Sequence, residues 1–431
     1  MTSAATRPVP AAGGAARPAS GLPRLLPPGL EDLGAHLARH GRAPHVTSDF
    51  IATVEAAGLT GRGGAAFPTH RKLAIVAEQR GPVKLVVANA AESEPASRKD
   101  ETLLSRAPHL VLDGLQLAAE AVGASQVYLY LHRATRTKAG VQAAIAERRA
   151  AGIDHREVLI AEAPPRFLAG QETALVNRIQ GGSALPSFGF PRVTERGIGG
   201  APTLVQNAET LAHLALIARY GPGWFRAVGT EHEPGTMLTT IHVLGSHPQV
   251  TELPIGVPLG AILDPASTSA VLIGGYHGTW LPMKHVLTLD NATLNPQGAA
   301  LGAGVIAALP HGYCGLAEAA RVVRYLAAES AGQCGPCLNG LPRMAAAMAE
   351  LAGPRPRPQT IDNIARWATV IPGRGACHHP DGTVRFVRSA LETFAAELAS
   401  HRNNQCTGTA SQPFLPVPDT RTMPTTEKEW L

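Results

Sequence analysis

The sequence predicts an α/β fold followed by a small β region and a helical bundle. Strand-like runs alternate with helical runs over residues 45–235, which is typical of an α/β layer with mostly parallel strands. Short β-type runs separated by Gly/Pro turns follow over residues 236–306. Ala-rich helical patterns then occupy residues 307–402, as in a small bundle. We expect residues 1–44 to be a largely disordered leader and residues 403–431 a disordered tail.

The individual elements follow from hydrophobic periodicity and from Gly and Pro punctuation. In the α/β layer the patterns predict helices over 31–40, 48–57, 68–80, 108–122, 135–151 and 203–220, strands over 84–90, 127–131 and 157–161, and a long loop over 181–202. In the β region they predict strands over 238–244, 249–253 and 270–273. In the last part they predict four helices over 316–326, 341–351, 360–370 and 384–401.

Composition narrows the class of protein. A chain of 431 residues suits two or three domains, and an odd count of five cysteines argues against a secreted disulfide framework. The net charge of +5 contains no block of like charges, so we expect no nucleic-acid partner. No apolar stretch approaches the length of a membrane span, so we expect no direct membrane insertion. A cytoplasmic protein, at most peripheral to a membrane complex, fits these features.

A glycine-rich loop is the first candidate binding element. Gly61, Gly63 and Gly64 precede a predicted helix, so backbone N–H groups and the helix start could cradle a phosphate. Lys72, in that helix, could add positive charge. The loop is not the dinucleotide fingerprint, because a helix rather than a strand precedes it. Taken alone, it is equally compatible with a structural turn.

Two further polar segments follow predicted strands. Asn89, Glu92 and Glu94 come after the first strand, and Gly170-Gln171-Glu172 comes after the third and opens a helix. Ligands of open parallel sheets bind outside the carboxyl ends of the strands. We therefore expect these segments and the glycine loop to meet at one edge, although the acidic segment alone would more often be a solvated loop.

The third candidate is a cysteine set. Cys334 and Cys337 form a C-x2-C pair, and Cys377 follows forty residues later. A four-cysteine iron–sulfur site would have another cysteine at the position of Ala331. Three thiolates could hold an incomplete iron–sulfur cluster, or zinc together with His378 or His379, or no metal at all.

Six motifs in order resemble one known family. They are Gly61-Arg-Gly-Gly-Ala-Ala-Phe-Pro-Thr69, Asn89-Ala-Ala-Glu-Ser-Glu-Pro95, Lys99-Asp100 with Pro108-His109, Gly170-Gln-Glu-Thr-Ala-Leu175, Pro202-Thr203 with Asn207-Ala-Glu-Thr210, and Glu329-Ser-Ala-Gly-Gln-Cys-Gly-Pro-Cys337. Together, over residues 45–400, they resemble the NADH-binding 51 kDa flavoprotein (F) subunit of respiratory complex I. The same family includes the diaphorase subunits of NAD-linked hydrogenases and formate dehydrogenases.

The resemblance implies a fold and a set of cofactors. It implies an atypical Rossmann-like FMN domain over 45–235, a ubiquitin-like β-grasp domain of the soluble-ligand-binding type over 236–306, and a four-helix bundle with a 4Fe-4S cluster over 307–402. It also implies NADH as substrate, with FMN between the two-electron donor and the one-electron cluster. A ferredoxin or other oxidoreductase subunits would be the redox partner.

The resemblance also assigns residues. It places Glu94 and Glu172 on the nicotinamide side as catalytic residues, and Phe67 against the dinucleotide. The remaining cofactor-binding positions that it implies are Gly61, Arg62, Gly63, Gly64, Lys72, Asn89, Glu92, Gly170, Gln171, Gln206 and Asn207. Cys334, Cys337 and Cys377 would be the metal ligands.

Departures from the family pattern put parts of the site in question. Ala91 and Gln171 replace acidic residues, and Gly189 and Arg192 stand in the segment where the family has the lysine and aromatic residue that clamp the dinucleotide. We therefore expect a partly degraded NADH site. Ala331 leaves the cluster one thiolate short, unless Cys314 folds back to replace it. Two alternatives remain: an FMN protein that exchanges electrons with ferredoxin without NADH, and a non-catalytic scaffold.

Overall fold

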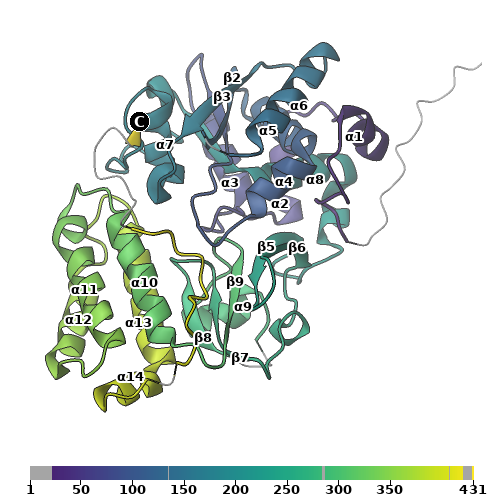
Figure 1. Ribbon diagram of the computed structural model, residues 1–431. Coiled ribbons are helices and arrows are strands. Elements are labelled where there is room, and N and C mark those ends of the chain that lie inside the picture. Colours follow the sequence, from purple (N-terminus) through teal and green to yellow (C-terminus); the bar gives the residue numbers. More distant parts are fainter. Residues whose placement is uncertain (1–21, 134, 284–286, 407, 421–429) are drawn as a thin grey trace, which may run out of the picture.

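The computed structural model describes residues 22–133, 135–283, 287–406, 408–420 and 430–431. Residues 1–21 of the expected leader and 421–429 of the expected tail lie outside the described residues. Figure 1 shows an α/β part, a second sheet beside it, and a group of helices packed against that sheet.

A parallel four-stranded sheet forms the centre of the α/β part, in the order β3-β2-β1-β4. Its strands are β1 (Leu85–Asn89), β2 (Gln126–His132), β3 (Val158–Ala163) and β4 (Thr203–Asn207), and the α/β part also contains the helices α1 (Leu33–His40), α2 (Phe50–Ala57), α3 (Thr69–Glu78), α4 (Lys99–Arg106), α5 (Pro108–Val122), α6 (Lys138–Ala150), α7 (Glu172–Ile179) and α8 (Ala208–Arg226). The expected parallel layer is therefore confirmed.

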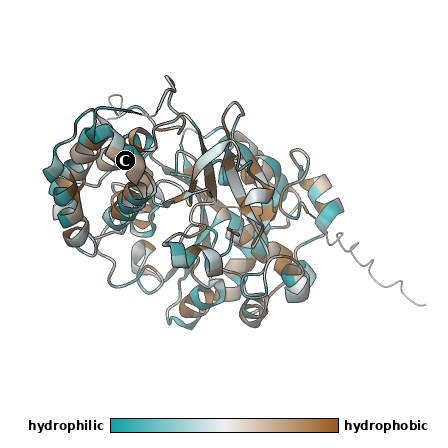
Figure 2. Ribbon diagram, turned by 90° about the horizontal axis from the view of Figure 1, so that it is seen from below, coloured by the Kyte–Doolittle hydropathy of each residue, from teal (hydrophilic) through white to brown (hydrophobic). Residues whose placement is uncertain are grey.

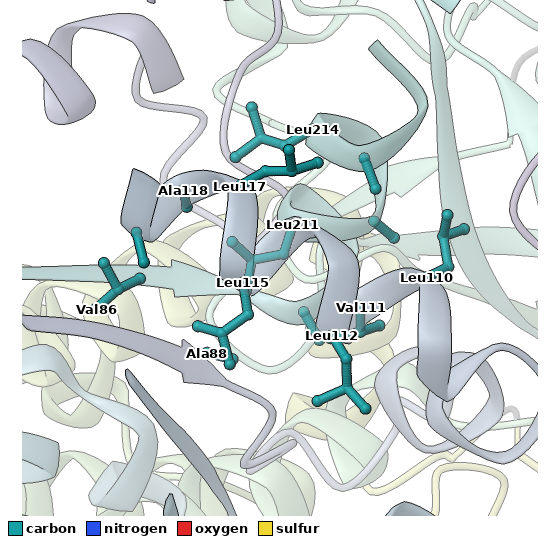
Figure 3. Packing of buried hydrophobic residues seen from close by; sticks show 14 of the residues in the cluster. Val86, Ala88, Leu110, Val111, Leu112, Leu115, Leu117, Ala118, Leu211 and Leu214 are labelled. Carbon is teal, nitrogen blue, oxygen red and sulfur yellow. The ribbon is translucent and has the colours of Figure 1, made fainter. Parts of the chain in front are cut away.

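The core of this part lies between β1 and the crossing helices α5 and α8. Figure 3 shows Leu115 and Leu211 meeting above Val86 and Ala88 of β1. The helices cross so closely that a Cβ on Gly114 would lie 1.9 Å from the Leu211 carbonyl oxygen. Figure 2 shows mainly hydrophobic strands inside and hydrophilic segments mostly on peripheral helices and loops.

One element of this part was predicted wrongly. Residues 203–207, expected as the start of a helix, form β4, and α8 begins only at Ala208. Thr203 and Leu204 are fully buried and pair in parallel register with Leu85 and Val86. Strand pairing and burial on both faces override the helical spacing here. The change matters because β4 brings Gln206 and Asn207 to the same edge as the end of β1.

The second sheet has five strands in the order β6-β5-β9-β7-β8. They are β5 (Thr236–His242), β6 (Gln249–Pro254), β7 (Thr268–Ile273), β8 (Thr279–Pro282) and β9 (Val305–Pro310), with the short helix α9 (Asn291–Leu294) between β8 and β9. Only β5 and β9 pair in parallel, and the other neighbours are antiparallel. The prediction missed β8, which is short, and β9, in which every residue is buried and no alternation exists.

The helical region contains α10 (Gly315–Ala328), α11 (Leu341–Ala352), α12 (Pro358–Val370), α13 (His379–Thr393) and α14 (Ala395–Arg402), with a π-helical turn over Pro336–Gly340. The expected helix over 384–401 is thus two helices, because the chain breaks at Phe394. The Phe394 ring packs against Gly315, where a Cβ would approach it to 2.2 Å. Among the described residues, no helix is both long and apolar enough to cross a membrane.

The described parts of the expected leader and tail are packed onto the protein rather than disordered. Leu25 is fully buried, and its backbone N–H donates to Glu252 Oε2 over 2.8 Å. In the C-terminal segment, the N–H groups of Phe414 and Leu415 each donate to Glu318 over 3.0 Å. Hydrogen bonds from backbone N–H groups and buried leucines hold both segments in place. The Pro-rich composition of these segments did not predict this packing.

Candidate cofactor and electron-transfer site

A cavity of about 1130 Å³ lies where the α/β part, the second sheet and the helical region meet. Among the residues that line it are Gly61, Gly63, Gly64, Phe67, Lys72, Asn89, Glu94, Gly170, Gln171, Glu172, Gln206 and Asn207. These are all the cofactor-binding and catalytic residues predicted from the sequence except Arg62 and Glu92. The polar segments that follow β1, β3 and β4 therefore meet at the carboxyl edge of the parallel sheet.

The glycine loop forms one wall of this cavity. The Gly61 N–H donates to the Phe67 carbonyl over 2.9 Å, which closes the loop into a hairpin-like turn ahead of α3. Gly64 has a φ of +103°, which favours glycine, and a Cβ on Gly63 would lie 3.3 Å from Asn207 Cβ. The bare backbone leaves room for a phosphate-bearing ligand, so the loop fits the phosphate end of FMN.

Polar side chains at the sheet edge are held by hydrogen bonds to one another and to neighbouring backbone groups. Lys72 Nζ lies 2.6 Å from Glu172 Oε1, and Asn89 Nδ2 donates to the Gly170 carbonyl over 2.9 Å. The Gln171 side chain accepts from the N–H groups of Thr173 and Ala174 and caps α7. Lys72 is thus a cation beside the glycine loop. An anionic ligand bound there could form an ion pair with Lys72 in place of Glu172.

Arg62 and Glu92 have structural positions outside this cavity. The buried Arg62 guanidinium points away from it and donates to the Thr236 carbonyl over 3.1 Å. Glu92 accepts from the N–H groups of Asp100 and Glu101, both at 3.1 Å, and so caps α4. Neither side chain faces the cavity in this structure.

A buried charge network fixes the end of β4. Lys99 Nζ lies 2.8 Å from Asp100 Oδ1 and 3.0 Å from Glu209 Oε2, and it donates to Asn207 Oδ1 over 3.1 Å. Asn207 Nδ2 in turn donates to Asp100 over 2.7 Å. The Lys99-Asp100 motif thus positions Asn207, a role that the sequence pattern did not reveal.

Glu94 is a titratable group within the cavity wall. Its Oε2 accepts from the Tyr276 N–H over 2.8 Å, which links the acidic segment to the second sheet. Burial raises the pKa of this carboxyl to about 7, although hydrogen bonds from Tyr276 and Ala96 oppose the shift. The folded protein therefore holds a proton at Glu94 at pH values where the unfolded chain has released it.

This shift predicts a pH-dependent stability. Because the folded pKa lies above the unfolded value, ionisation of Glu94 destabilises the fold as pH rises from about 4.5 to about 7. Glu94→Gln cannot ionise, so its stability relative to the parent should improve by about 2 kcal/mol between pH 5 and pH 8. Denaturant unfolding of both proteins at the two pH values measures this. A difference that stays constant with pH would show that folding does not raise the pKa of Glu94.

The later part of the chain lines the other side of the cavity with residues that no sequence pattern indicated. Gly274, His277 and Gly278 from the β7–β8 turn, Gly302 before β9, and Arg385 from α13 also line it. Only glycine fits at position 278, because a Cβ there would lie 2.0 Å from the Ile273 carbonyl oxygen. The paired glycines at 274–275 were a signal of close backbone approach, but nothing in the sequence connected them with the first loop.

A pair of histidines connects this cavity to the cysteine set. His277, which lines the cavity, lies with Nε2 3.0 Å from Nδ1 of His379, and His379 Nε2 donates to the Leu326 carbonyl over 2.8 Å. His379 follows Cys377 by two residues, and the Phe167 ring packs against both imidazoles. The cavity and Cys377 are thus separated by packed side chains.

The cysteine set is gathered at the end of the helical region that faces the cavity. Cys334 and Cys337 have their sulfurs 3.7 Å apart, and Cys337 and Cys377 are only 3% and 8% exposed. Burial and the neighbouring sulfurs raise the pKa of the Cys337 thiol to about 11. The three thiols that the sequence predicts as iron–sulfur ligands thus lie in one region, and Ala331 offers no fourth sulfur donor.

The alternatives considered for this set are not supported by the geometry. Both ring nitrogens of His379 are engaged, and the exposed His378 interacts with Asp381. Neither histidine is therefore placed as a zinc ligand with the cysteines. Cys314 precedes α10, whereas Cys334 lies beyond its other end, about 21 Å away along the 14-residue helix. Cys314 cannot replace the missing thiolate in this arrangement.

Restoring the missing thiolate should complete the cluster site. We expect about three irons per chain in the parent isolated in air and about four in Ala331→Cys, because a fourth thiolate retains the otherwise exposed iron. Iron and sulfide analysis after anaerobic and aerobic isolation measures this. Ser330→Cys adds a thiol one residue away and serves as the control, which should match the parent. Equal iron in all three proteins would contradict a three-thiolate cluster.

Comparison with known proteins agrees with this geometry. The family descriptions "Nuo51 FMN-binding domain" and "NADH-ubiquinone oxidoreductase-F iron-sulfur binding region" match residues 54–216 and 317–401. The chain is 28% identical over 387 residues to the F 2 subunit of the NADH-quinone oxidoreductase of Rhizobium meliloti, covering 85% of this chain and 92% of that protein. It is 29% identical to the F subunit of the Escherichia coli enzyme, covering 85% of this chain and 86% of that protein.

A solved structure shares the fold. The chain aligns with a crystal structure of NAD+-reducing [NiFe]-hydrogenase in the H2-reduced state, with a TM-score of 0.75 and 27% identity. The match covers 85% of this chain and 63% of the hydrogenase chain, so this chain spans less than two thirds of that relative.

Fold and site together define a protein with an FMN-binding domain and an iron–sulfur binding region. Within that class, the chain resembles the NADH-quinone oxidoreductase F subunits and fits a divergent member of that group.

Proposed function

We propose that this protein is a flavin-dependent electron-transfer subunit that passes electrons between NADH and a one-electron partner through an iron–sulfur cluster. The observation that carries the proposal is the shared cavity. It joins the glycine loop, the carboxyl edge of the parallel sheet and a histidine pair that leads to Cys377. FMN bound there would accept a hydride and release single electrons.

The chain's own residues have separable roles in this proposal. The glycine loop and Lys72 would hold the phosphate, and Asn89 would orient the flavin from the sheet edge. Glu94 and Glu172 would face the nicotinamide. The packed ring of Phe167 and the imidazoles of the histidine pair would exclude water between flavin and cluster.

We further propose the finer architecture that the family implies. The strand order β6-β5-β9-β7-β8, with a parallel central pair β5–β9, supports a ubiquitin-like β-grasp domain over 236–306. The packing of α10 to α13 supports a four-helix bundle over 307–402. The first domain would then extend over 45–235. The protein would act in the cytoplasm, peripheral to a membrane complex if it joins one.

A second candidate function differs in the redox partner and in the use of NADH. Other oxidoreductase subunits are the partners that the relatives suggest, and ferredoxin is an alternative one-electron partner. The substitutions Gly189 and Arg192 favour a form that holds FMN and exchanges electrons with ferredoxin without NADH. The retained cavity argues against a non-catalytic scaffold, because a scaffold has no need for a bare glycine wall.

One experiment distinguishes these functions. Anaerobically purified protein should contain FMN and iron, and NADH should bleach the flavin absorbance. Bleaching by reduced ferredoxin but not by NADH would favour the second candidate. Protein that takes up neither flavin nor iron, even after reconstitution, would overturn the proposal and favour the scaffold.

A further inference from the structure

A second group of potential metal ligands lies at the end of α10 remote from the cluster cysteines. The sulfurs of Cys314 and Cys406 and a ring nitrogen of His401 all lie within 4.8 Å of one another. Cys314 caps the start of α10, His401 belongs to the last turn of α14, and Cys406 follows in the segment beyond. We propose that Cys314, His401 and Cys406 form a zinc site that fastens the C-terminal segment to the helical region.

The histidine is oriented as a metal ligand would be. His401 is 2% exposed, and its Nδ1 lies 2.9 Å from the Leu351 carbonyl oxygen. A carbonyl oxygen can only accept, so Nδ1 carries the proton and Nε2 presents its lone pair. Metal-binding histidines commonly donate their other ring N–H to a carbonyl in this way. The free Nε2 faces Cys314 Sγ.

The distance between these two atoms suits tetrahedral zinc. Zinc binds sulfur at about 2.3 Å and imidazole nitrogen at about 2.0–2.1 Å, which places the two donors about 3.6 Å apart. Cys314 Sγ and His401 Nε2 lie 3.6 Å apart. Zinc could therefore bind between them after the thiol loses its proton, without movement of either backbone.

The backbone on both sides of Cys406 is tied to the same place. Before it, the Gln405 N–H donates to the Ser400 carbonyl over 3.0 Å. After it, the N–H groups of Thr409 and Ala410 donate to the Gly312 carbonyl over 2.8 and 3.1 Å. A Cβ on Gly408 would approach Cys314 Cβ to 2.8 Å, so the segment passes directly over Cys314. Cys406 is thus held where its exposed thiol can complete the set.

The fourth position has a nearby candidate. Glu397 Oε2 accepts from the Leu316 N–H over 3.2 Å, and its carboxylate also lies within hydrogen-bonding reach of Cys314. Either this carboxylate or a water molecule would complete a four-coordinate zinc site with the two thiolates and the imidazole. This inference does not depend on the flavin or on NADH.

The test is metal binding by reduced full-length protein in which the cluster cysteines cannot compete. In a Cys334→Ser/Cys337→Ser background, the protein should bind one zinc per chain in competition with a chromophoric chelator. Cobalt should give a thiolate-to-metal charge-transfer band and tetrahedral visible bands. Adding Cys406→Ser, which changes an exposed side chain, should weaken zinc binding at least about hundredfold and remove the charge-transfer intensity of one thiolate.

Stability supplies an independent readout. Zinc should raise the unfolding temperature of the background protein and not that of the protein carrying Cys406→Ser. Equal zinc affinity with and without Cys406, or no zinc bound at micromolar concentration, would overturn the proposal. So would a Cys314–Cys406 disulfide in protein isolated anaerobically, detected by mass spectrometry of peptides alkylated without reduction.

Discussion

Gly63→Val should leave the purified protein without flavin. A Cβ at this position would already lie 3.3 Å from Asn207 Cβ, and the two further carbons of valine would occupy the space along the glycine wall. Backbone donors can approach a phosphate closely only where no side chain intervenes. We expect flavin content to fall from about one per chain to a few per cent, measured by absorbance after reconstitution with excess FMN.

A second glycine supplies the control for this change. Gly140 lies in α6, where a Cβ would have no neighbour within 4 Å. Gly140→Val adds the same side chain away from the cavity and should retain flavin like the parent. Circular dichroism of both variants separates flavin loss from unfolding. Flavin bound normally by Gly63→Val would show that the ligand does not lie against the glycine loop.

The first half of the site could be predicted because its signals are local. A strand that ends in Asn89, a loop of glycines before a helix, and a polar helix start at Gln171 each indicate a position on the sheet edge. Parallel topology then brings them together without further information. The distinction between Arg62 and its glycine neighbours could not be predicted, because it depends on the Thr236 carbonyl that meets the guanidinium in the folded chain.

The second half could not be predicted for a physical reason. His277 and Arg385 reach the cavity only because the second sheet and α13 pack against the first part of the chain. Hydrophobic periodicity within a segment carries no information about which distant segment packs against it. Similarly, β9 shows no alternation of apolar and polar residues, because both of its faces are buried. The C-terminal segment is mostly polar in sequence, yet Leu415 is buried and its N–H donates to Glu318.

We expect the loop over residues 181–202 to influence how strongly NADH binds. Ser187 on this loop exchanges hydrogen bonds with Thr173, which follows the cavity residue Glu172, so the loop stands at the cavity rim. Phe188 and Phe190 are 77% and 75% exposed, and neither lines the cavity. A phosphate contact from lysine and an aromatic stack are each worth about 1–3 kcal/mol, so the loss of both should weaken NADH binding about hundredfold or more.

Gly189→Lys should recover part of this loss. A Cβ on Gly189 would meet nothing within 4 Å, so the loop has room for a lysine without rearrangement. One charged phosphate contact of about 1–3 kcal/mol should tighten NADH binding about 5- to 150-fold. Anaerobic titration with NADH, followed by flavin bleaching, measures the change. Gly29→Lys adds the same charge at another open position outside the cavity lining and should leave the affinity unchanged.

A measurement on the parent protein can contradict the expected weak binding of NADH. Micromolar affinity for NADH together with fast flavin reduction would mean that other groups have replaced the clamp. Arg385 is the first to examine, because its guanidinium lines the cavity and is held by the His277 carbonyl over 2.6 Å. In that case Arg385→Gln should weaken NADH binding, and Gly189→Lys should add little. If Gly189→Lys instead tightens binding and Arg385→Gln has no effect, the loop substitutions alone explain a weak NADH site.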